Sequence, residues 1–275
     1  MLDFLGIGAQ KAGTAWLFYR LREHPEAWFS PGGKEIHFFD VVHLGTDRAR
    51  RLAVIRKNAR KAMWDLRRGN PFAGTGFLFS GLRRLGREDY AFTDDWYRDL
   101  FSSRPKGGKA GEITPVYAAL PEAGVRHVHA LMPDVPIIHI LRDPLDRAIS
   151  SLRMQLEDNP GMDAATAMAD PVFRARCDYR ANVARWESVF DPAQILHLPF
   201  GDIKSDPLGV LHRVEAHVGL SRFDGYDLAS KSINSSASNN AVITPAVRAT
   251  LEAMVEGQQA FVEERFGRDF ASRLK

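Results

Sequence analysis

Short apolar runs alternate with helical patterns along most of this chain. FLGIG (4–8) is an apolar run that ends in glycine, and the segment 14–24 after it has a helical pattern. PIIHILRDP (136–144) is almost continuously apolar before its arginine, as in a parallel strand buried on both faces. This alternation predicts an α/β fold with a mainly parallel central sheet and helices on both faces. Further strands are expected at 27–30, 109–114 and 194–200, and further helices at 94–101, 121–132, 145–157, 172–190, 207–219 and 245–266.

The chain has 275 residues and shows neither an internal repeat nor a linker, so we expect one domain over 1–275. A basic helical excursion is predicted at about 47–90, where apolar residues recur at helical spacing and twelve lysines and arginines lie between Arg48 and Arg87. One interpretation is a solvated basic helix face. The other is a surface for an anionic or amphiphilic acceptor or for an anionic membrane, helped by three phenylalanines at 72, 77 and 79.

Charge and cysteine content exclude several classes of protein. The single cysteine, Cys177, rules out an internal disulfide framework and a zinc site built on cysteines. The net charge of +3 suits an anionic ligand but falls short of a nucleic-acid-binding protein. The N-terminal segment lacks the pattern of a signal peptide, so we expect a cytoplasmic protein. The sequence predicts no oligomeric state.

The segment GAQKAGTA (8–15) has glycines five residues apart, as in a phosphate-binding loop of the Walker type. Thr14 stands where that loop has its lysine, and Ala15 stands where it has a hydroxyl that binds Mg²⁺. The lysine is instead Lys11. Small residues before a helix still allow backbone amides to surround a phosphate. A P-loop-like architecture that binds a 5′-phosphate without Mg²⁺ is therefore predicted.

The second element is ILRDPLDRAIS (140–150). Arg142 stands at a strand end and Ser150 about two helical turns later, which makes the pair a candidate clamp for a second phosphate. The alternative is an ordinary helix start, with Asp143 as N-cap, Pro144 at the first position and Arg147 in a surface ion pair. Both interpretations can hold together.

These two elements resemble the sulfotransferases that use 3′-phosphoadenosine 5′-phosphosulfate (PAPS). Residues 8–17 look like their 5′-phosphosulfate loop and residues 140–150 like their 3′-phosphate motif. Other segments are similar, in the same order, to the heparan-sulfate-type branch and its bacterial relatives: KEIHFFD (34–40), DWYRDLF (95–101), EITPVY (112–117), KSINSSASNN (231–240) and FGRDF (266–270).

The resemblance implies PAPS as co-substrate, no metal, and sulfonyl transfer to a carbohydrate, lipid or small-metabolite acceptor. It implies that Lys11 neutralises the leaving phosphate and that Glu35 is the base. Apolar neighbours are expected to raise the pKa of Glu35. On a strand, His37 would share its face as a second base or an orienting group, and Thr114 and Tyr117 are candidate substrate contacts. The residues expected to contact PAPS are Gln10, Lys11, Ala12, Gly13, Thr14, Ala15, Trp16, Arg142, Ser150, Lys231 and Asn234.

Two alternatives stay open from the sequence. A nucleotide kinase would share the loop and the fold but would need a GK[ST] sequence, which this chain lacks, and Mg²⁺. A protein without enzymatic activity could keep the phosphate site and use its basic excursion on an anionic membrane. Replacing Glu35 would leave the function of such a protein unchanged.

Overall fold

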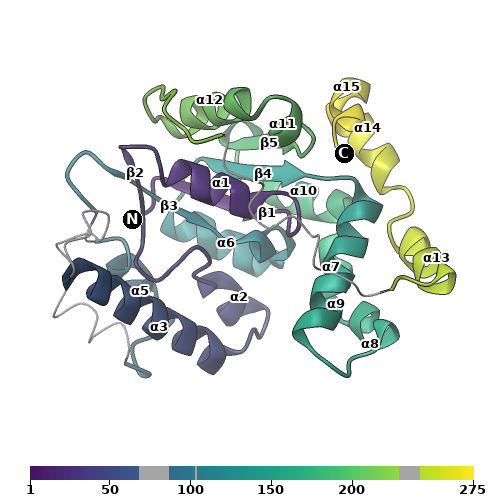
Figure 1. Ribbon diagram of the computed structural model, residues 1–275, viewed down its shortest axis with the longest axis horizontal. Coiled ribbons are helices and arrows are strands. Elements are labelled where there is room, and N and C mark those ends of the chain that lie inside the picture. The colour runs from purple at the N-terminus through teal and green to yellow at the C-terminus, as the bar shows by residue number, and fades with distance from the viewer. Residues whose placement is uncertain (68–86, 103, 229–241) are drawn as a thin grey trace.

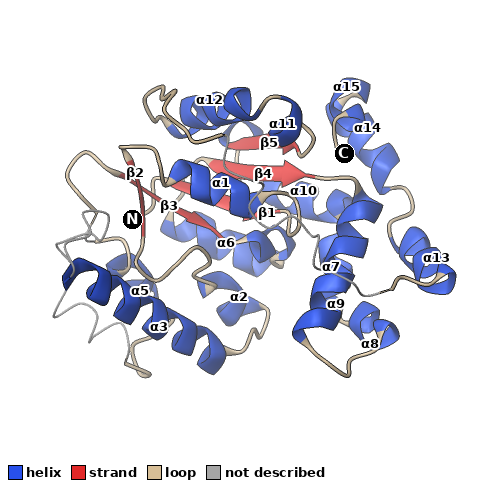
Figure 2. Cartoon of the chain, in the orientation of Figure 1, coloured by secondary structure: helices blue, strands red, loops and turns tan. Residues whose placement is uncertain are grey.

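The computed structural model describes residues 1–67, 87–102, 104–228 and 242–275 (Figure 1). Its strands form one parallel sheet in the order β2-β3-β1-β4-β5, which places β1 at the centre (Figure 2). This confirms the predicted α/β class and the strand positions. The strands are β1 (Phe4–Gly8), β2 (Ala27–Phe29), β3 (Lys109–Ile113), β4 (Ile137–Leu141) and β5 (Ile195–Pro199).

Helices cover both faces of the sheet because successive residues of a strand point to opposite sides. Phe4 of β1 packs in a cluster with α1 and α12, whereas Leu5 and Ile7 pack in another with α2, α5 and α6. The described α-helices are α1 (Thr14–Leu21), α2 (Phe38–His43), α3 (Arg48–Arg67), α5 (Asp94–Asp99), α6 (Glu122–Leu131), α7 (Pro144–Asp158), α8 (Ala164–Ala169), α9 (Pro171–Cys177), α10 (Tyr179–Glu187), α11 (Asp202–Ser205), α12 (Pro207–Val218), α13 (Pro245–Met254), α14 (Gln258–Phe266) and α15 (Arg268–Ser272), and the short 3₁₀ helices are η1 (Pro115–Ala119) and η2 (Pro192–Gln194).

A third apolar cluster joins α7, α8, α9 and α13 beside the sheet. It holds α7 and α9 next to the ends of β1 and β4, where the predicted phosphate motifs lie. In a parallel sheet, ligands bind beyond the carboxyl ends of the strands. We therefore expect the ligand site at this edge of the sheet. Among the described helices, none is both long enough and apolar enough to cross a membrane.

Three local predictions were wrong. The helix expected at 172–190 is divided at Asp178, whose side chain accepts the amide of Ala181 (3.0 Å) and so begins α10. The helix expected at 245–266 is divided at Gly257, which takes a left-handed conformation with φ of 75°. The segment 34–37 is not a strand, because His37 has φ of 59° and begins α2.

Candidate active site

The loop of residues 9–13, here called the first loop, leads from β1 into α1. Gly13 begins α1 in the left-handed conformation, with φ of 83°, and no side chain of the described residues caps the helix. A side chain at Gly13 would be strained at this φ and would also meet Ile203 Cδ1 at 2.5 Å, so the tight turn favours glycine. The first amides of an uncapped helix and its positive dipole end favour an anion. These are the amides of the predicted phosphate contacts Thr14, Ala15 and Trp16.

The two predicted phosphate motifs contact one another. Arg142 Nη1 donates a hydrogen bond to the carbonyl oxygen of Lys11 at 2.9 Å. Lys11 has φ of 69°, which turns its carbonyl toward this corner of the sheet. Burial and the nearby charge of Arg142 lower the pKa of Lys11. A lysine whose pKa is lowered by a neighbouring arginine is a group that a bound polyanion would stabilise.

The segment after β4 contains both a helix start and an unpaired hydroxyl. Asp143 Oδ1 accepts the amide of Asp146 (3.0 Å) and Pro144 begins α7, which confirms the predicted cap. Ser150, on α7, is 6% exposed, and its Oγ has no hydrogen-bond partner among the described residues. A buried hydroxyl without a partner is costly, so Ser150 fits a ligand oxygen.

The predicted surface ion pair of Arg147 is wrong. Arg147 is 0% exposed, and its Nη2 donates to Cys177 Sγ at 2.8 Å. Within the described part of the chain, its Nε and Nη1 have no hydrogen-bond partner. The cause is the apolar cluster of α7 and α9, which draws this face of α7 inside. Burial raises the pKa of the Cys177 thiol.

Gln10 of the first loop is fixed from two helices. Its Oε1 accepts hydrogen bonds from Ser151 Oγ of α7 (3.1 Å) and from Arg176 Nη1 of α9 (3.0 Å). Gln10 was expected to contact PAPS, and its side-chain carbonyl instead anchors the first loop to α7 and α9. The sequence offered no signal for Arg176, which is far from the loop along the chain.

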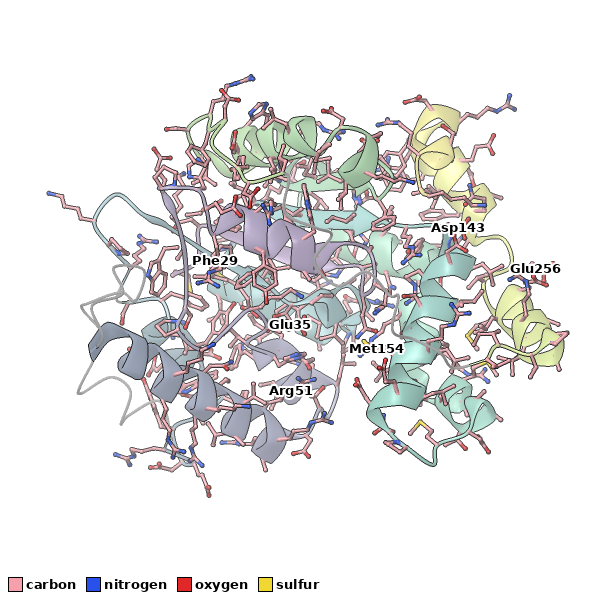
Figure 3. The ribbon with its side chains drawn as sticks, in the orientation of Figure 1. Phe29, Glu35, Arg51, Asp143, Met154 and Glu256 are labelled. Atoms are coloured by element: carbon pink, nitrogen blue, oxygen red, sulfur yellow. The ribbon has the colours of Figure 1, made fainter. Side chains whose placement is uncertain are left out.

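Glu35, His37 and Asp40 form one hydrogen-bonded group, here called the acid–histidine cluster. His37 Nδ1 lies 2.9 Å from Asp40 Oδ2, and His37 Nε2 lies 3.1 Å from Glu35 Oε2. Asp40 is 1% exposed, whereas the Glu35 side chain is 35% exposed and also contacts Lys34 Nζ at 2.5 Å. Figure 3 shows Glu35 between the ribbons of α1 and α2. His37 and Glu35 thus meet as predicted, but through a helix start and not through a strand.

The predicted raised pKa of Glu35 is wrong. Burial alone would raise it, but the hydrogen bond from His37 and the charges of Lys34 and His37 outweigh burial and lower the pKa of Glu35 to about 2. Burial would likewise lower the pKa of His37, yet its hydrogen bonds to Asp40 and Glu35 raise it. The two carboxylates therefore favour the charged form of the ring that lies between them. The spacing of His37 and Asp40, three residues apart at a helix start, was the signal that could have revealed Asp40.

Thr114 and Tyr117 lie beneath this cluster. Both are 0% exposed, so the prediction that they contact substrate is corrected. Thr114 Oγ1 accepts the amide of Ile36 (3.2 Å), and Tyr117 Oη accepts the amide of Phe38 (2.8 Å). Buried amides need such partners. The two side chains therefore position the backbone that carries the acid–histidine cluster.

Other predicted site features are not placed by the structure. Lys231 and Asn234 lie outside the described residues, as do the phenylalanines of the basic excursion. Over the described ranges, no group of three or more His, Cys, Asp or Glu side chains is arranged to hold a metal ion. The absence of a metal from the reaction stays a prediction.

Comparison with known proteins identifies the family. A family model described as "Sulfotransferase family" matches residues 4–225, a span that includes the first loop, the acid–histidine cluster and the Arg142 corner. The chain belongs to the sulfotransferase family. The resemblance seen in the sequence motifs is therefore confirmed.

Named sulfotransferases of the heparan sulfate type are similar to part of this chain. Human heparan sulfate glucosamine 3-O-sulfotransferase 6 is 29% identical over 184 residues, which are 61% of this chain and 51% of that protein. The mouse 3-O-sulfotransferase 3B1 is 28% identical over 188 residues, covering 61% and 45% respectively. The chain matches about half the length of these curated relatives.

Solved sulfotransferases share the fold. The sulfotransferase from Alicyclobacillus acidocaldarius has a TM-score of 0.67 and 23% identity, over 100% of this chain and 99% of that one. The sulfotransferase domain of the Synechococcus PCC 7002 olefin synthase has a TM-score of 0.56 and 19% identity, over 91% and 86%. The predicted P-loop-like architecture is confirmed at the level of the fold.

Proposed function

We propose that this protein transfers the sulfonyl group of PAPS to a hydroxyl or an amine of an acceptor. The observation that carries the proposal is the contact of Arg142 with Lys11, which sets two cations beside the uncapped start of α1. The first loop would hold the 5′-phosphate, and Arg142 with the unpaired hydroxyl of Ser150 would hold the 3′-phosphate. Sulfotransferase family membership supports the assignment.

The reaction sets two tasks for the protein. The bond between sulfur and the 5′-phosphate oxygen breaks with its electron pair going to that oxygen, a bond from sulfur to the acceptor forms, and the acceptor's proton goes to a base. Lys11 is the cation of the first loop that can neutralise the departing phosphate oxygen. Glu35 is the candidate base, since it is the partly exposed carboxylate of the acid–histidine cluster.

A carboxylate with a pKa of about 2 is ionised at neutral pH but is a weak proton acceptor. Its basicity rises if a contact from His37 or Lys34 is lost when the acceptor enters. His37 then acts as a positioning residue that holds Glu35 until the acceptor competes for it, and Asp40 keeps the ring charged. This arrangement explains how one carboxylate can be both fixed in place and available.

The acceptor that we propose to test first is a carbohydrate, since the relatives are named for glucosamine of heparan sulfate. Labelled PAPS is incubated with panels of glycans, aminolipids and small alcohols, using wild type, Lys11→Ala and Glu35→Gln. We expect label on one class of acceptor with wild type and a loss of about 10²-fold or more with either variant.

Two results would reject the proposal. Transfer from ATP with Mg²⁺ and none from PAPS would support the kinase alternative. Label transfer that is equal in wild type and Glu35→Gln would reject Glu35 as the base, and binding of PAPS without any label transfer would support a binding protein without catalysis.

The exposed face of α3 supports a second proposal, that this face meets an anionic acceptor or an anionic membrane surface. Among the described residues, four of its exposed cations have no carboxylate within ion-pair distance, in contrast to Arg56, which lies 3.8 Å from Glu88. Several cations near an anionic bilayer contribute about 1 kcal/mol each. The four are Arg50, Lys57, Arg60 and Lys61.

A further inference from the structure

Arg176 of α9 contacts the first loop, as Arg142 does, but at a different residue. Its Nη1 donates to Gln10 Oε1 at 3.0 Å. Its Nε is buried and has no hydrogen-bond partner in the described parts of the chain, while the residue as a whole is partly exposed. The guanidinium therefore has one donor committed to the loop and one buried donor still unsatisfied.

The charge of Arg176 is poorly compensated. No carboxylate of the described residues forms an ion pair with it, although the charges of Asp170, Asp40 and Glu35 act on it from further away, and the fully buried Arg147 is a second cation nearby. Burial and Arg147 lower the pKa of Arg176 to about 10, so it stays charged at neutral pH. A partly buried cation without a close anion is destabilising. An anionic group that enters from solvent would relieve this cost.

The position of Arg176 indicates which anionic group of a ligand it would bind. It bonds the first loop, and the negative charges that act on it are those of Asp170, then Asp40 and Glu35 of the acid–histidine cluster. Helix α9 also packs on η1, whose Tyr117 holds the backbone of the acid–histidine cluster. In sulfonyl transfer, the group between the leaving phosphate and the base is the sulfonate itself.

We propose that Arg176 binds the sulfonate oxygens of PAPS and so distinguishes PAPS from its product PAP, which lacks them. The inference rests on the proposed function. The forked guanidinium can donate to two oxygens of one tetrahedral anion, which a lysine cannot do in the same geometry. Arg142 and Ser150 contact both PAPS and PAP, whereas Arg176 contacts PAPS alone.

The test measures the dissociation constants of PAPS and PAP by calorimetry, without acceptor. We expect Arg176→Met to raise the dissociation constant of PAPS about tenfold or more and that of PAP less than about threefold. Arg176→Lys keeps the charge and is expected to lose part of this preference. The matched control is Arg174→Met on the same helix, because Arg174 is exposed and its Nε bonds the carbonyl of Met168 (3.0 Å). That control is expected to change neither constant.

A purely structural role for Arg176 predicts something different. If Arg176 acts only by holding Gln10, then Arg176→Met and Gln10→Leu each raise the dissociation constants of PAPS and PAP by the same factor. That result overturns the inference. Equal affinities of wild type and Arg176→Met for PAPS would overturn it as well. If wild type binds neither nucleotide, it is the proposed function that fails. Should Arg176→Met not fold, Arg176→Lys decides by the same ratio of the two constants.

Discussion

Replacing Glu35 with glutamine is expected to lower the pKa of His37. The ring of His37 lies between Glu35 and Asp40, with nitrogen–oxygen distances of 3.1 and 2.9 Å. Burial would lower the pKa of this histidine, and the hydrogen bonds and charges of the two carboxylates raise it. Glutamine keeps an oxygen at the same place but removes one charge, so the imidazolium loses part of its stabilisation.

The size of the expected change in the pKa of His37 follows from the pKa of Glu35. A pKa lowered from 4.5 to about 2 in Glu35 corresponds to roughly 3 kcal/mol at 1.36 kcal/mol per pH unit. Lys34 supplies part of this, and the Glu35 side chain is 35% exposed, which allows water to screen the charges. We therefore assign roughly 1 kcal/mol to the coupling between Glu35 and His37. The same coupling acts on both residues, because it is one interaction.

The assay is a titration of histidine ring protons by NMR, with the His37 resonance assigned from His37→Gln. Asp40→Asn is expected to lower the midpoint of His37 as Glu35→Gln does. Asp94→Asn is the matched control, since Asp94 pairs with a different histidine, His127, at 2.9 Å. A midpoint of His37 that stays unchanged in Glu35→Gln would refute the claim that the two groups share a proton-linked contact.

Three further predictions concern stability and surface binding. Tyr117→Phe removes the acceptor of the Phe38 amide, and we expect a loss of about 1–3 kcal/mol in the free energy of unfolding, measured with urea; no loss would mean that another group accepts this amide. The stabilisation by the depressed pKa of Glu35 is present above 4.5 and lost as the pH falls toward 2. The stabilisation by the raised pKa of His37 is fully present below 6.5 and lost as the pH rises through the raised pKa of the folded state. The cluster should thus add most stability between about pH 4.5 and 6.5, and thermal melts of His37→Gln should lack this contribution. Replacing the exposed cations of α3 with glutamine should abolish sedimentation with phosphatidylserine vesicles, if the face binds membrane, and leave PAPS binding intact; sedimentation equal to that of wild type would exclude the membrane. The cations replaced are Arg50, Lys57, Arg60 and Lys61, and Arg48, which is also exposed, is kept because it bonds the carbonyl oxygens of Glu88 and Ala91.

Much of the fold was predictable because parallel strands buried on both faces leave a strong apolar signal. The five strands begin or end within a residue or two of the segments predicted for them. The helix breaks at Asp178 and Gly257 were missed, although both residue types favour helix ends. The apolar stripe continues across both breaks, so it predicts one helix where a single capping residue ends the first helix and begins the next.

The meeting of the two predicted phosphate motifs was predictable from spacing, since their glycine, lysine and arginine positions follow strand ends. The contact of Arg142 with Lys11 agrees with that prediction. The pKa of Glu35 was not predictable, because it depends on which neighbours face the carboxylate. Ile36, which follows it in sequence, is 1% exposed in the core, while His37 and Lys34 bond the carboxylate instead.

The two arginines of α9 show why the remaining part of the site could not be predicted from the sequence. PVFRARC has two arginines among seven residues, and composition alone would place both at the surface. Phe173 and Cys177, four residues apart, form the buried stripe of the helix. Arg176 precedes Cys177 by about 100° around the helix axis, so it lies at the edge of that stripe, and Arg174 lies about 200° from Arg176. Such a position lets one arginine reach the first loop while the other stays in solvent, and only the packing of α9 against η1 determines what Arg176 meets there.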